Sequence, residues 1–460
     1  MKRSRFPLML IAMLAIAATG VGAAPARQDA PSGEVSFGFW GAPEELEAYQ
    51  TLVEAFEASQ SGITVEIDHV PGADDFYARL ATGFAAGDPP DVFLTNYRRY
   101  GQFAARGALE PIGPRLAASS TLTEDEFYPT PLDAFRQEGE LICLPQNVSS
   151  LVVYANQDLF AAAGVPLPEP GWTWDDFLAA AQALTIDTDG DGLTDQYGLG
   201  VENSLIRFAP FIWQAGGEIV DDLERPTRLT IDTPEARAGI QFFIDLSLVH
   251  KVVPTEAEVL AEDDESRFLN GTTAMLLQSR RVVPTLRQIE GFAWDVAALP
   301  RGVQEAGILH SDAYCLSAGA DNADVAWAFI EFANSAEGQA IVARTGRTVP
   351  SLRAVANSPA FLGLRGLGGV DAPATGTEAA GAGALAARLN PPASSRIFLD
   401  TIPQIRRLPS ISTWPEVEDA FNTTLGRAFY GEIGIDDAIA LAQSRSEAAF
   451  ERAAREMDQG

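Results

Sequence analysis

The spacing of hydrophobic and polar residues predicts alternating strands and helices at the start of the chain. Residues 34–41 and 63–70 alternate as strands do, and 91–94 is a short apolar run after turn residues. Residues 43–59 and 74–86 repeat apolar side chains at helical spacing. This order is typical of an open α/β sheet, in which ligands bind beyond the carboxyl ends of parallel strands. The polar and aromatic residues at those ends are Trp40, Asn96, Tyr97 and Arg98.

A strand, a short helix, a Pro-rich connection and a second helix are expected over residues 153–185. Asp158 is placed to cap the first helix, and Gly164 is placed to end it. Thr173, with Asp176 three residues later, is a capping-box-like start for the second helix.

The N-terminus has the pattern of an export signal. Lys2, Arg3 and Arg5 precede an apolar run at 8–18 that is too short to span a bilayer, and small residues follow. We therefore expect residues 1–26 to be removed, and the mature protein to work in the periplasm or at the outer cell surface. Because no cysteine lies near the expected cleavage site, we expect no lipid anchor there. A short N-terminal membrane anchor is the alternative.

Length and composition narrow the possible functions. A chain of 460 residues is too long for one ordinary hydrophobic core, so two lobes are expected. Its formal net charge of -31 opposes binding to nucleic acid and to anionic lipid headgroups. Neither Lys2 nor Lys251 lies in a phosphate-binding Gly-Lys-Ser/Thr loop. The 3 histidines are far apart in sequence, which disfavours a His-rich zinc site.

A set of short blocks carries a family resemblance. The blocks are AAGDPPDV (85–92), AARGALEPI (104–112), YANQDLFAAAG (154–164), FIWQAGG (211–217), AMLL (274–277) and VAWAFIEFANSAEG (325–338). In this order they resemble blocks of the family 1 extracellular solute-binding proteins, the sugar-capturing components of bacterial ABC importers.

The resemblance implies an α/β fold of the two-lobe, type II periplasmic-binding-protein kind. Each lobe is expected to be a mostly parallel sheet flanked by helices, with the ligand cleft between the lobes and three crossings of the chain. Lobe one would hold 27–142 and 316–348, lobe two would hold 146–312 and 355–460, and hinge segments would lie near 143–145, 313–315 and 349–354.

The resemblance also implies a function. The chain is expected to be an extracytoplasmic, monomeric binding protein that captures a carbohydrate and delivers it to the membrane permease of an ABC transporter. No catalysis and no catalytic cofactor are expected. An exported glycoside hydrolase that uses two carboxylates is the enzymatic alternative. With 63 acidic residues the chain always offers such a pair, so their presence does not favour it.

Aromatic faces pack against the C–H faces of sugar rings, and polar side chains fix the hydroxyls. Position and resemblance mark some aromatic residues as candidate platforms, with core packing as the alternative for each. These are Trp40, Tyr97, Trp213 and Tyr314. The candidate polar partners are Asn96, Arg98, Asn147 and Ser149.

Arg280 and Arg281 stand where many relatives carry a Gly-x-Trp block whose tryptophan stacks on the sugar. Arginine binds carboxylate and phosphate groups bidentately. The departure therefore keeps open a ligand that is an acidic sugar or a polyol phosphate. The alternative is that both arginines balance nearby acidic residues.

Residues 187–195 fit the calcium-loop pattern D-x-D-x-D-G. The expected ligands of a structural calcium ion are Asp187, Asp189, Asp191, the Leu193 carbonyl and Asp195. The usual glutamate at the twelfth position is Gly198 here, so a distant carboxylate such as Glu202 would have to substitute. An acidic turn held by its own Asx hydrogen bonds is the alternative.

Cys143 and Cys315 are the two cysteines, and each lies in a strand-like run. In an exported protein they could form a disulfide. In relatives the first and second crossovers, where these residues fall, lie side by side in the hinge. The resemblance thus makes a pairing between them possible, with two free thiols as the alternative.

Overall fold

The computed structural model describes residues 31–363 and 392–458. The expected export signal at 1–26 lies outside the described residues. Within the described part of the chain, no helix is both long enough and apolar enough to cross a membrane.

The first sheet is built mainly from the N-terminal part of the chain. Its strand order is β2-β1-β3-β13-β4, with β7 also paired to β13. The edge strand β2 runs parallel to β1, and β1 runs parallel to β3, whereas β13 runs antiparallel to β3. The strands are β1 (Gly33–Trp40), β2 (Ile63–Val70), β3 (Val92–Asn96), β4 (Leu109–Glu110), β7 (Cys143–Pro145) and β13 (Asp312–Ser317).

The second sheet has the order β11-β8-β10-β9. The prediction of a mostly parallel sheet is wrong for this lobe, because β8 runs antiparallel to both β10 and β11 and only β9 and β10 are parallel. Hydrophobic spacing along one strand carries no information about the direction of a partner far away in the sequence. The strands are β8 (Val152–Asn156), β9 (Tyr197–Gly200), β10 (Thr273–Gln278) and β11 (Trp294–Ala297).

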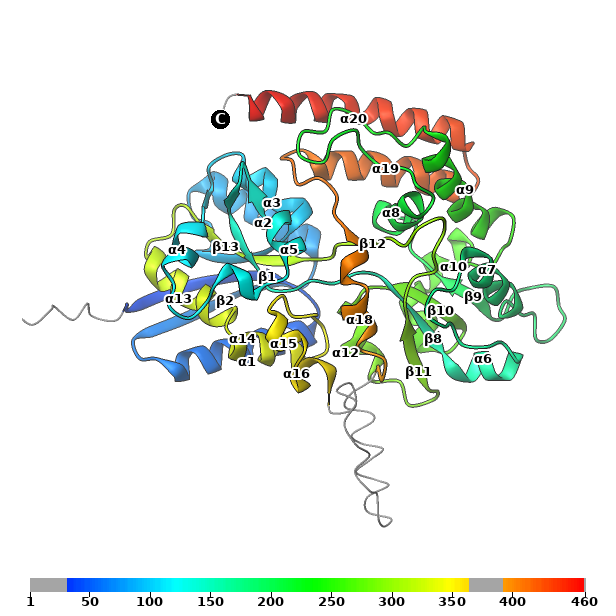
Figure 1. Cartoon of the computed structure of the whole chain (residues 1–460), viewed down its shortest axis with the longest axis horizontal. Coiled ribbons are helices and arrows are strands. Elements are labelled where there is room, and N and C mark those ends of the chain that lie inside the picture. The colour runs from blue at the N-terminus through cyan, green and yellow to red at the C-terminus, as the bar shows by residue number, and fades with distance from the viewer. Residues whose placement is uncertain (1–30, 364–391, 459–460) are drawn as a thin grey trace, which may run out of the picture.

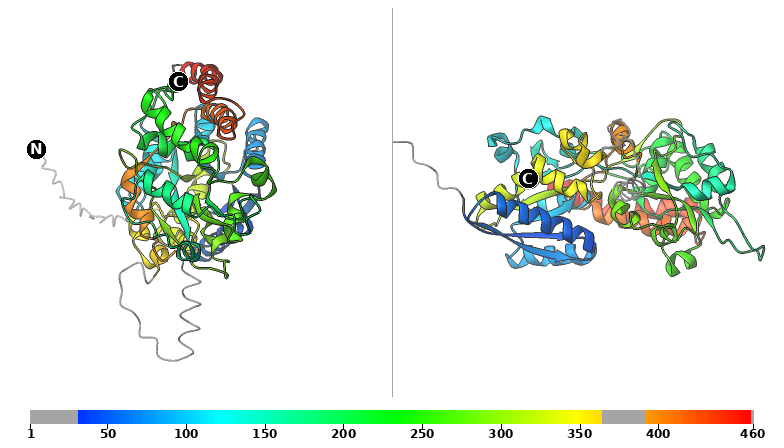
Figure 2. Two further views of the ribbon diagram at one scale, coloured as in Figure 1. Left: turned by 90° about the vertical axis from the view of Figure 1, so that its right-hand side faces the viewer. Right: turned by 90° about the horizontal axis from the view of Figure 1, so that it is seen from below.

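Helices cover both sheets, so the fold is α/β with two lobes that lie side by side along the long axis (Figures 1 and 2). The first lobe carries α1 (Pro43–Ser59), α2 (Ala73–Ala86), α3 (Tyr97–Ala104), α5 (Pro129–Ala134), α13 (Ala323–Ala333) and α14 (Ala336–Arg344). The second lobe carries α6 (Gln157–Ala163), α7 (Trp174–Ala183), α8 (Leu205–Gln214), α9 (Pro234–Leu248), α11 (Asp264–Leu269) and α12 (Val283–Leu286).

The last helices, α19 (Trp414–Phe429) and α20 (Ile435–Met457), pack against each other. Helix α19 contacts α8 and α9 of the second lobe, and it also contacts α3 of the first lobe. Helix α20 extends along one edge of the molecule until its C-terminal end lies over the first lobe (Figure 1). The C-terminal segment therefore bridges the lobes. The residue boundaries expected for the lobes and the hinge stay predictions.

Capping explains why two helices begin where they do. Helix α7 starts at the predicted capping box, in which the Thr173 hydroxyl accepts from the Asp176 N–H and the Asp176 carboxylate accepts from the Thr173 N–H. For α6 the predicted cap lies two residues too late. Asn156, rather than Asp158, is the N-cap, and its Oδ1 accepts from the Asp158 and Leu159 N–H groups at 3.1 Å each.

Candidate ligand-binding site

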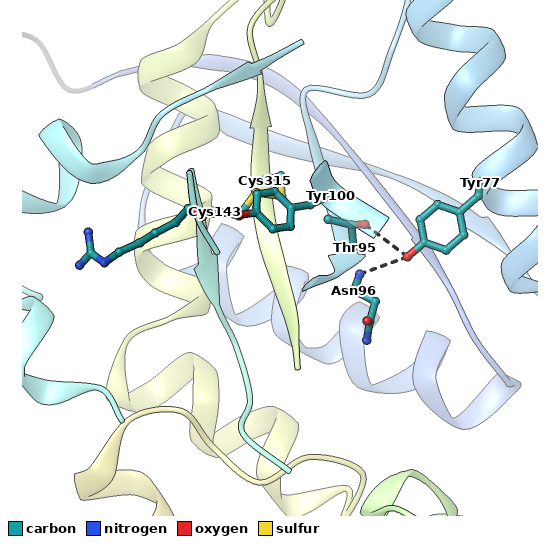
Figure 3. Close-up of a disulfide and its surroundings, with 7 residues drawn as sticks. Tyr77, Thr95, Asn96, Tyr100, Cys143 and Cys315 are labelled. Atoms are coloured by element: carbon teal, nitrogen blue, oxygen red, sulfur yellow. Dashed lines mark hydrogen bonds between the residues drawn. A yellow bond between two sulfur atoms is a disulfide. The ribbon is translucent and has the colours of Figure 1, made fainter. Parts of the chain in front are cut away.

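The first lobe contributes a contiguous polar and aromatic surface at the ends of β1 and β3. Trp40 is partly exposed, and its ring lies 5.3 Å from the ring of Tyr77. The Tyr77 hydroxyl accepts from the Asn96 N–H at 3.1 Å and lies 3.2 Å from the Thr95 Oγ1 (Figure 3). The Asn96 Nδ2 donates to the Asp312 Oδ1 at 3.0 Å, which links β3 to β13. Trp40 and Asn96 are thus placed near one another, as the strand-end argument predicted.

Arg98 reaches from the first lobe to helix α19. Its backbone N–H donates to the Asn96 Oδ1, the N-cap of α3, so the start of the helix fixes its position. Its guanidinium forms an ion pair with Glu418, and the two side chains are 14% and 8% exposed. Burial lowers the pKa of Arg98, but the Glu418 carboxylate acts together with Tyr97 and Tyr77 to raise the pKa above the ordinary value. This pair is a charged contact between the lobes.

Arg207 occupies the first turn of α8, just beyond the end of β9. Its side chain is 2% exposed, its Nη2 donates to the Gln278 Oε1 at 2.8 Å, and the Glu202 Oε2 lies 3.2 Å away. The Nε and Nη1 groups of Arg207 have no hydrogen-bond partner among the described residues. Burial lowers the pKa of this guanidinium, although Glu202 opposes the effect. Buried donors without hydrogen-bond partners cost stability. A ligand that accepts from these donors removes the cost, so the arrangement is typical of a binding site.

The two sides meet around His310, which precedes β13. Burial lowers the pKa of His310 well below its usual range, and the positive charges of Arg207, Arg98 and Arg281 lower it further. Arg98 belongs to the first lobe, whereas Arg207 and Arg281 belong to the second. We call the following residues the interlobe polar network: Asn96, Arg98, Glu202, Arg207, Arg281, His310, Asp312 and Glu418.

The two neighbouring arginines of the sequence prediction have different positions. Arg281 is 54% exposed and pairs with Glu265 at 3.2 Å, so it is an exposed member of the network. Arg280 is 1% exposed, and its guanidinium lies 4.3 Å from the Phe361 ring centre and 4.8 Å from that of Phe398. The structure therefore corrects the prediction for Arg280, because a guanidinium enclosed by two aromatic rings does not face a ligand.

Three of the four predicted aromatic platforms lie in the core, namely Tyr97, Tyr314 and Trp213. Tyr97 and Tyr314 are both 0% exposed. The Tyr97 hydroxyl accepts from the Leu408 N–H at 3.2 Å, and Tyr314 packs 5.8 Å from the ring of Phe37. The platform prediction is corrected for both residues, because a buried ring presents no face to a sugar. Position at a strand end did not reveal which side of the sheet each ring would cover.

Trp213 follows Arg207 on α8, but six residues of helix turn it toward a different side. It is 2% exposed, and Arg406 lies 4.9 Å from its ring centre. Trp213 lines a separate cavity of ≈ 400 Å³ together with Thr130 and Asp133 of the first lobe. The structure therefore does not bring Trp213 together with the interlobe polar network.

Asn147 and Ser149 lie buried where the chain crosses between lobes, at 5% and 4% exposure. The Asn147 Oδ1 accepts from the Asp312 N–H at 2.7 Å, and the Ser149 N–H donates to the His310 carbonyl at 3.0 Å. Both residues therefore tie the crossing segments together directly beneath the network.

Cys143 and Cys315 form a disulfide in the structure, with their Cα atoms 4.5 Å apart (Figure 3). They are register partners on β7 and β13, and both are 0% exposed. The bond joins two crossover strands inside the first sheet.

The acidic loop at 187–195 is mostly exposed. Carboxylate oxygens of Asp187, Asp189 and Asp195 approach within 4.8 Å of one another. Asp191 is not part of this group, and its Oδ1 accepts from the Leu193 N–H at 2.8 Å, just as Asp187 and Asp189 accept from backbone N–H groups of the loop. Glu202 was considered as a substitute ligand, but it pairs with Arg207 instead.

Sequence reasoning missed Arg207 and Glu418, and it considered Glu202 only as a calcium ligand. Arg207 is the one charged residue in the apolar run LIRFAPFIW that begins at Leu205, and this isolated charge was an available signal. Glu418 offered none, because an acidic residue on an amphipathic helix is common and its partner Arg98 lies 320 residues away.

Two α/β lobes, joined by crossing strands and facing each other across a polar network, define the class of two-lobe solute-binding proteins. The family model for bacterial extracellular solute-binding proteins matches residues 42–340, and the chain belongs to this family.

Named relatives and solved structures are similar over most of the chain. The maltotriose-binding protein of Pyrococcus abyssi is 24% identical over 328 residues, which cover 69% of this chain and 66% of that protein. An ABC substrate-binding protein of Listeria monocytogenes, solved in complex with cycloalternan, has a TM-score of 0.78 at 22% identity and covers 93% of this chain and 100% of its own. A Thermotoga lettingae solute-binding protein bound with α-D-tagatose has a TM-score of 0.73 at 22% identity, covering 91% and 100%. Both structures share the two-lobe fold.

Proposed function

We propose that this solute-binding protein captures a carbohydrate between its two lobes and delivers it to the membrane permease of an ABC transporter. The observation that carries the proposal is the interlobe polar network, in which buried Arg207 donors remain unpaired among the described residues. Hydroxyl groups are suitable partners, since each donates and accepts. The names of the relatives support the same ligand class, because one binds maltotriose and two solved structures contain cycloalternan and tagatose.

Hinge motion would give the ligand access to the network. The Arg98–Glu418 pair joins α3 to α19, so separation of the lobes breaks it and exposes both side chains. A ligand that contacts both lobes favours the closed form, because it binds that form more tightly than the open one. The permease then distinguishes the closed, loaded protein from the open one. We propose that the mature chain acts as an exported monomer without catalytic activity.

A thermal-shift screen of the purified protein against neutral and acidic sugars tests this function. Binding to the native state stabilises it by RT ln(1 + [L]/Kd) and so raises the melting temperature. We expect at least one carbohydrate to raise it and to be recovered unchanged afterwards. Slow release of cleaved products would instead favour the glycoside hydrolase alternative.

An acidic sugar or a polyol phosphate is the second candidate ligand. It is favoured by the guanidinium of Arg281, which is an exposed member of the network. The same screen separates the two candidates when each neutral sugar is matched with its acidic counterpart.

We also propose that the loop at 187–195 binds a structural calcium ion through Asp187, Asp189 and Asp195. The close approach of their carboxylate oxygens supports the site, since calcium prefers several carboxylate ligands. Calcium should raise the melting temperature of the wild type but not of an Asp187→Asn/Asp189→Asn variant. Asp222→Asn, a change in another exposed turn, is the control and should respond as the wild type does. An equal response of all three proteins would contradict the proposal.

A further inference from the structure

We infer that the ligand is an uncharged, hydroxyl-rich carbohydrate and that Arg207 is the residue that determines its recognition. This inference rests on the proposed function and narrows it. The sequence predicted that Arg280 contributes to ligand specificity. The inference assigns that role to Arg207, which was not among the predicted site residues.

Arg207 is the side chain in the network with the most unsatisfied hydrogen-bonding capacity. It is 2% exposed, and both Nε and Nη1 are without a partner among the described residues. Its Nη2 is held by Gln278 and Glu202, so the guanidinium is fixed in place before any ligand arrives. A fixed donor pair that loses no side-chain freedom on binding gives both affinity and orientation.

Other unsatisfied atoms lie in the same region, and they are of both kinds. Arg98 Nε is a donor without a partner among the described residues, and Glu418 Oε2 and Asp264 Oδ1 are acceptors in the same condition. The Ser204 Oγ, which can do either, is also unpaired there. A hydroxyl group accepts from a guanidinium and donates to a carboxylate at the same time, whereas a carboxylate or phosphate dianion only accepts. The mixture therefore matches a polyol.

The charges lead to the same conclusion. Each arginine of the network already has a carboxylate partner: Arg98 pairs with Glu418, Arg207 with Glu202 and Arg281 with Glu265. Asp312 and Asp264 add further acidic groups close to Arg98 and Arg207. An anionic ligand would have to approach these carboxylates without a surplus of positive charge, and the repulsion would oppose binding. Charge pairing thus favours an uncharged ligand.

The test compares matched sugars on the intact mature protein. The panel holds neutral mono- and oligosaccharides and, for each, the counterpart oxidised to a carboxylate at C6. Affinity is measured by calorimetry at constant ionic strength. We expect a neutral member to bind at least about tenfold more tightly than its acidic counterpart, because like charges brought together in an interface cost several kcal/mol and tenfold corresponds to about 1.4 kcal/mol.

Two variants then test Arg207 itself. Arg207→Lys keeps the charge but removes the fixed donors, and Arg207→Gln removes the charge as well. We expect each to weaken binding of the preferred neutral sugar by about 10- to 100-fold, as loss of a buried hydrogen-bonded contact does. Arg452→Lys, in an exposed pair with Glu416, is the matched control and should bind as the wild type does.

The possible results lead to separate conclusions. Tighter binding of the acidic sugars would overturn the inference about ligand charge but leave the carbohydrate function standing. Wild-type affinity of a folded Arg207→Lys protein would overturn the role of Arg207. Binding of no panel member at all would contradict the proposed function and this inference with it. The comparison of neutral and acidic sugars on the wild type needs no variant, so it decides the ligand charge even if both variants fail to fold.

Discussion

At the scale of single residues, burial shifts the pKa of ionisable groups and changes their contribution to stability. Arg280 lies between Phe361 and Phe398, and its Nη1 is 3.4 Å from the Ser395 Oγ. Burial lowers the pKa of this guanidinium to about 9. Desolvation of a cation is costly, and contact with two aromatic faces recovers only part of that cost.

Arg280→Met should therefore keep or raise stability. Methionine fills a similar volume with a flexible apolar chain and removes the cost of burying the charge. Replacement of buried ion pairs by apolar residues is neutral or stabilising by about 1–4 kcal/mol, and we expect an effect within that range. Urea denaturation measures the free energy of unfolding. Ligand affinity should stay within about twofold of the wild type, because Arg280 is enclosed by rings rather than facing the network. A large loss of affinity without loss of stability would return Arg280 to the binding site.

Asp264 should make stability depend on pH. Burial raises its pKa to about 6, although Arg267 opposes the shift. The folded protein therefore binds this proton more tightly than the unfolded chain, in which the pKa is about 3.9. Between about pH 4 and 6 this group makes the free energy of unfolding fall as the pH rises, by up to about 1.4 kcal/mol per pH unit.

The variant Asp264→Asn lacks this contribution. The free energy of unfolding of the wild type and of the variant is measured at pH values from about 4 to 7. The difference between the two proteins should change between about pH 4 and 6 and stay constant above about pH 6. Other groups titrate equally in the two proteins and cancel. A difference that is independent of pH would contradict the raised pKa.

Single residues also mark the limit of sequence reasoning. The strand-end rule placed Trp40, Asn96 and Arg98 at or beside the network, because the end of a strand follows from local alternation. The same rule failed for Tyr97 and Tyr314, since the side that a ring covers depends on segments packed against it from elsewhere in the chain. Arg207 is a different case, because its isolated charge in an apolar run was an available signal, but its partner Gln278 lies 71 residues away.

At the scale of elements, local signals located most helices and strands well. Helix α1 and strand β2 have the predicted bounds, because the apolar spacing of each segment ends at turn residues. Local spacing did not indicate whether two paired strands are parallel or antiparallel. Strand β8 pairs with β10 through Met275 and Ala155, which are far apart in sequence, and the antiparallel pairing became visible only in the structure.

Removing the disulfide should lower stability without weakening the ligand site. The bond between Cys143 and Cys315 closes a loop with a sequence separation of 172, and loss of such a crosslink costs about 2–5 kcal/mol. Denaturation of a Cys143→Ala/Cys315→Ala variant measures this cost. Affinity should be retained, because both cysteines lie within the first sheet and not in the network. Loss of affinity at unchanged stability would show that the bond positions the ligand site instead.

At the scale of the whole molecule, the account depends on two lobes that separate and close. The overall class of fold could be predicted, because alternation of strands and helices and the family blocks extend over most of the chain. The contact between α3 and α19 could not, since it joins residues at opposite ends of the sequence. That contact contains the Arg98–Glu418 pair, which is a charged link of the closed form in the proposed hinge motion.

Glu418→Gln should shift the molecule toward the open form. The change keeps the shape of the side chain but removes the charge that pairs with Arg98. The closed form is then less populated in the absence of ligand, and this lowers the apparent affinity. We expect weaker apparent affinity, by about 5- to 150-fold, as typical coupling energies give. Small-angle X-ray scattering should show a larger radius of gyration than for the wild type at the same subsaturating ligand concentration. Arg452→Ala is the control, and equal scattering of the Glu418→Gln and wild-type proteins would contradict the role of the pair.

Capture of a neutral carbohydrate through Arg207 is tested by a calorimetric titration of the mature protein. The titrant is the neutral carbohydrate that gives the largest thermal shift. We expect saturable binding of one ligand per protein, with no turnover and with affinity that falls when Arg207 is replaced by lysine. Absence of saturable binding by any carbohydrate to the folded protein, or binding that Arg207→Lys leaves unchanged, would contradict this expectation.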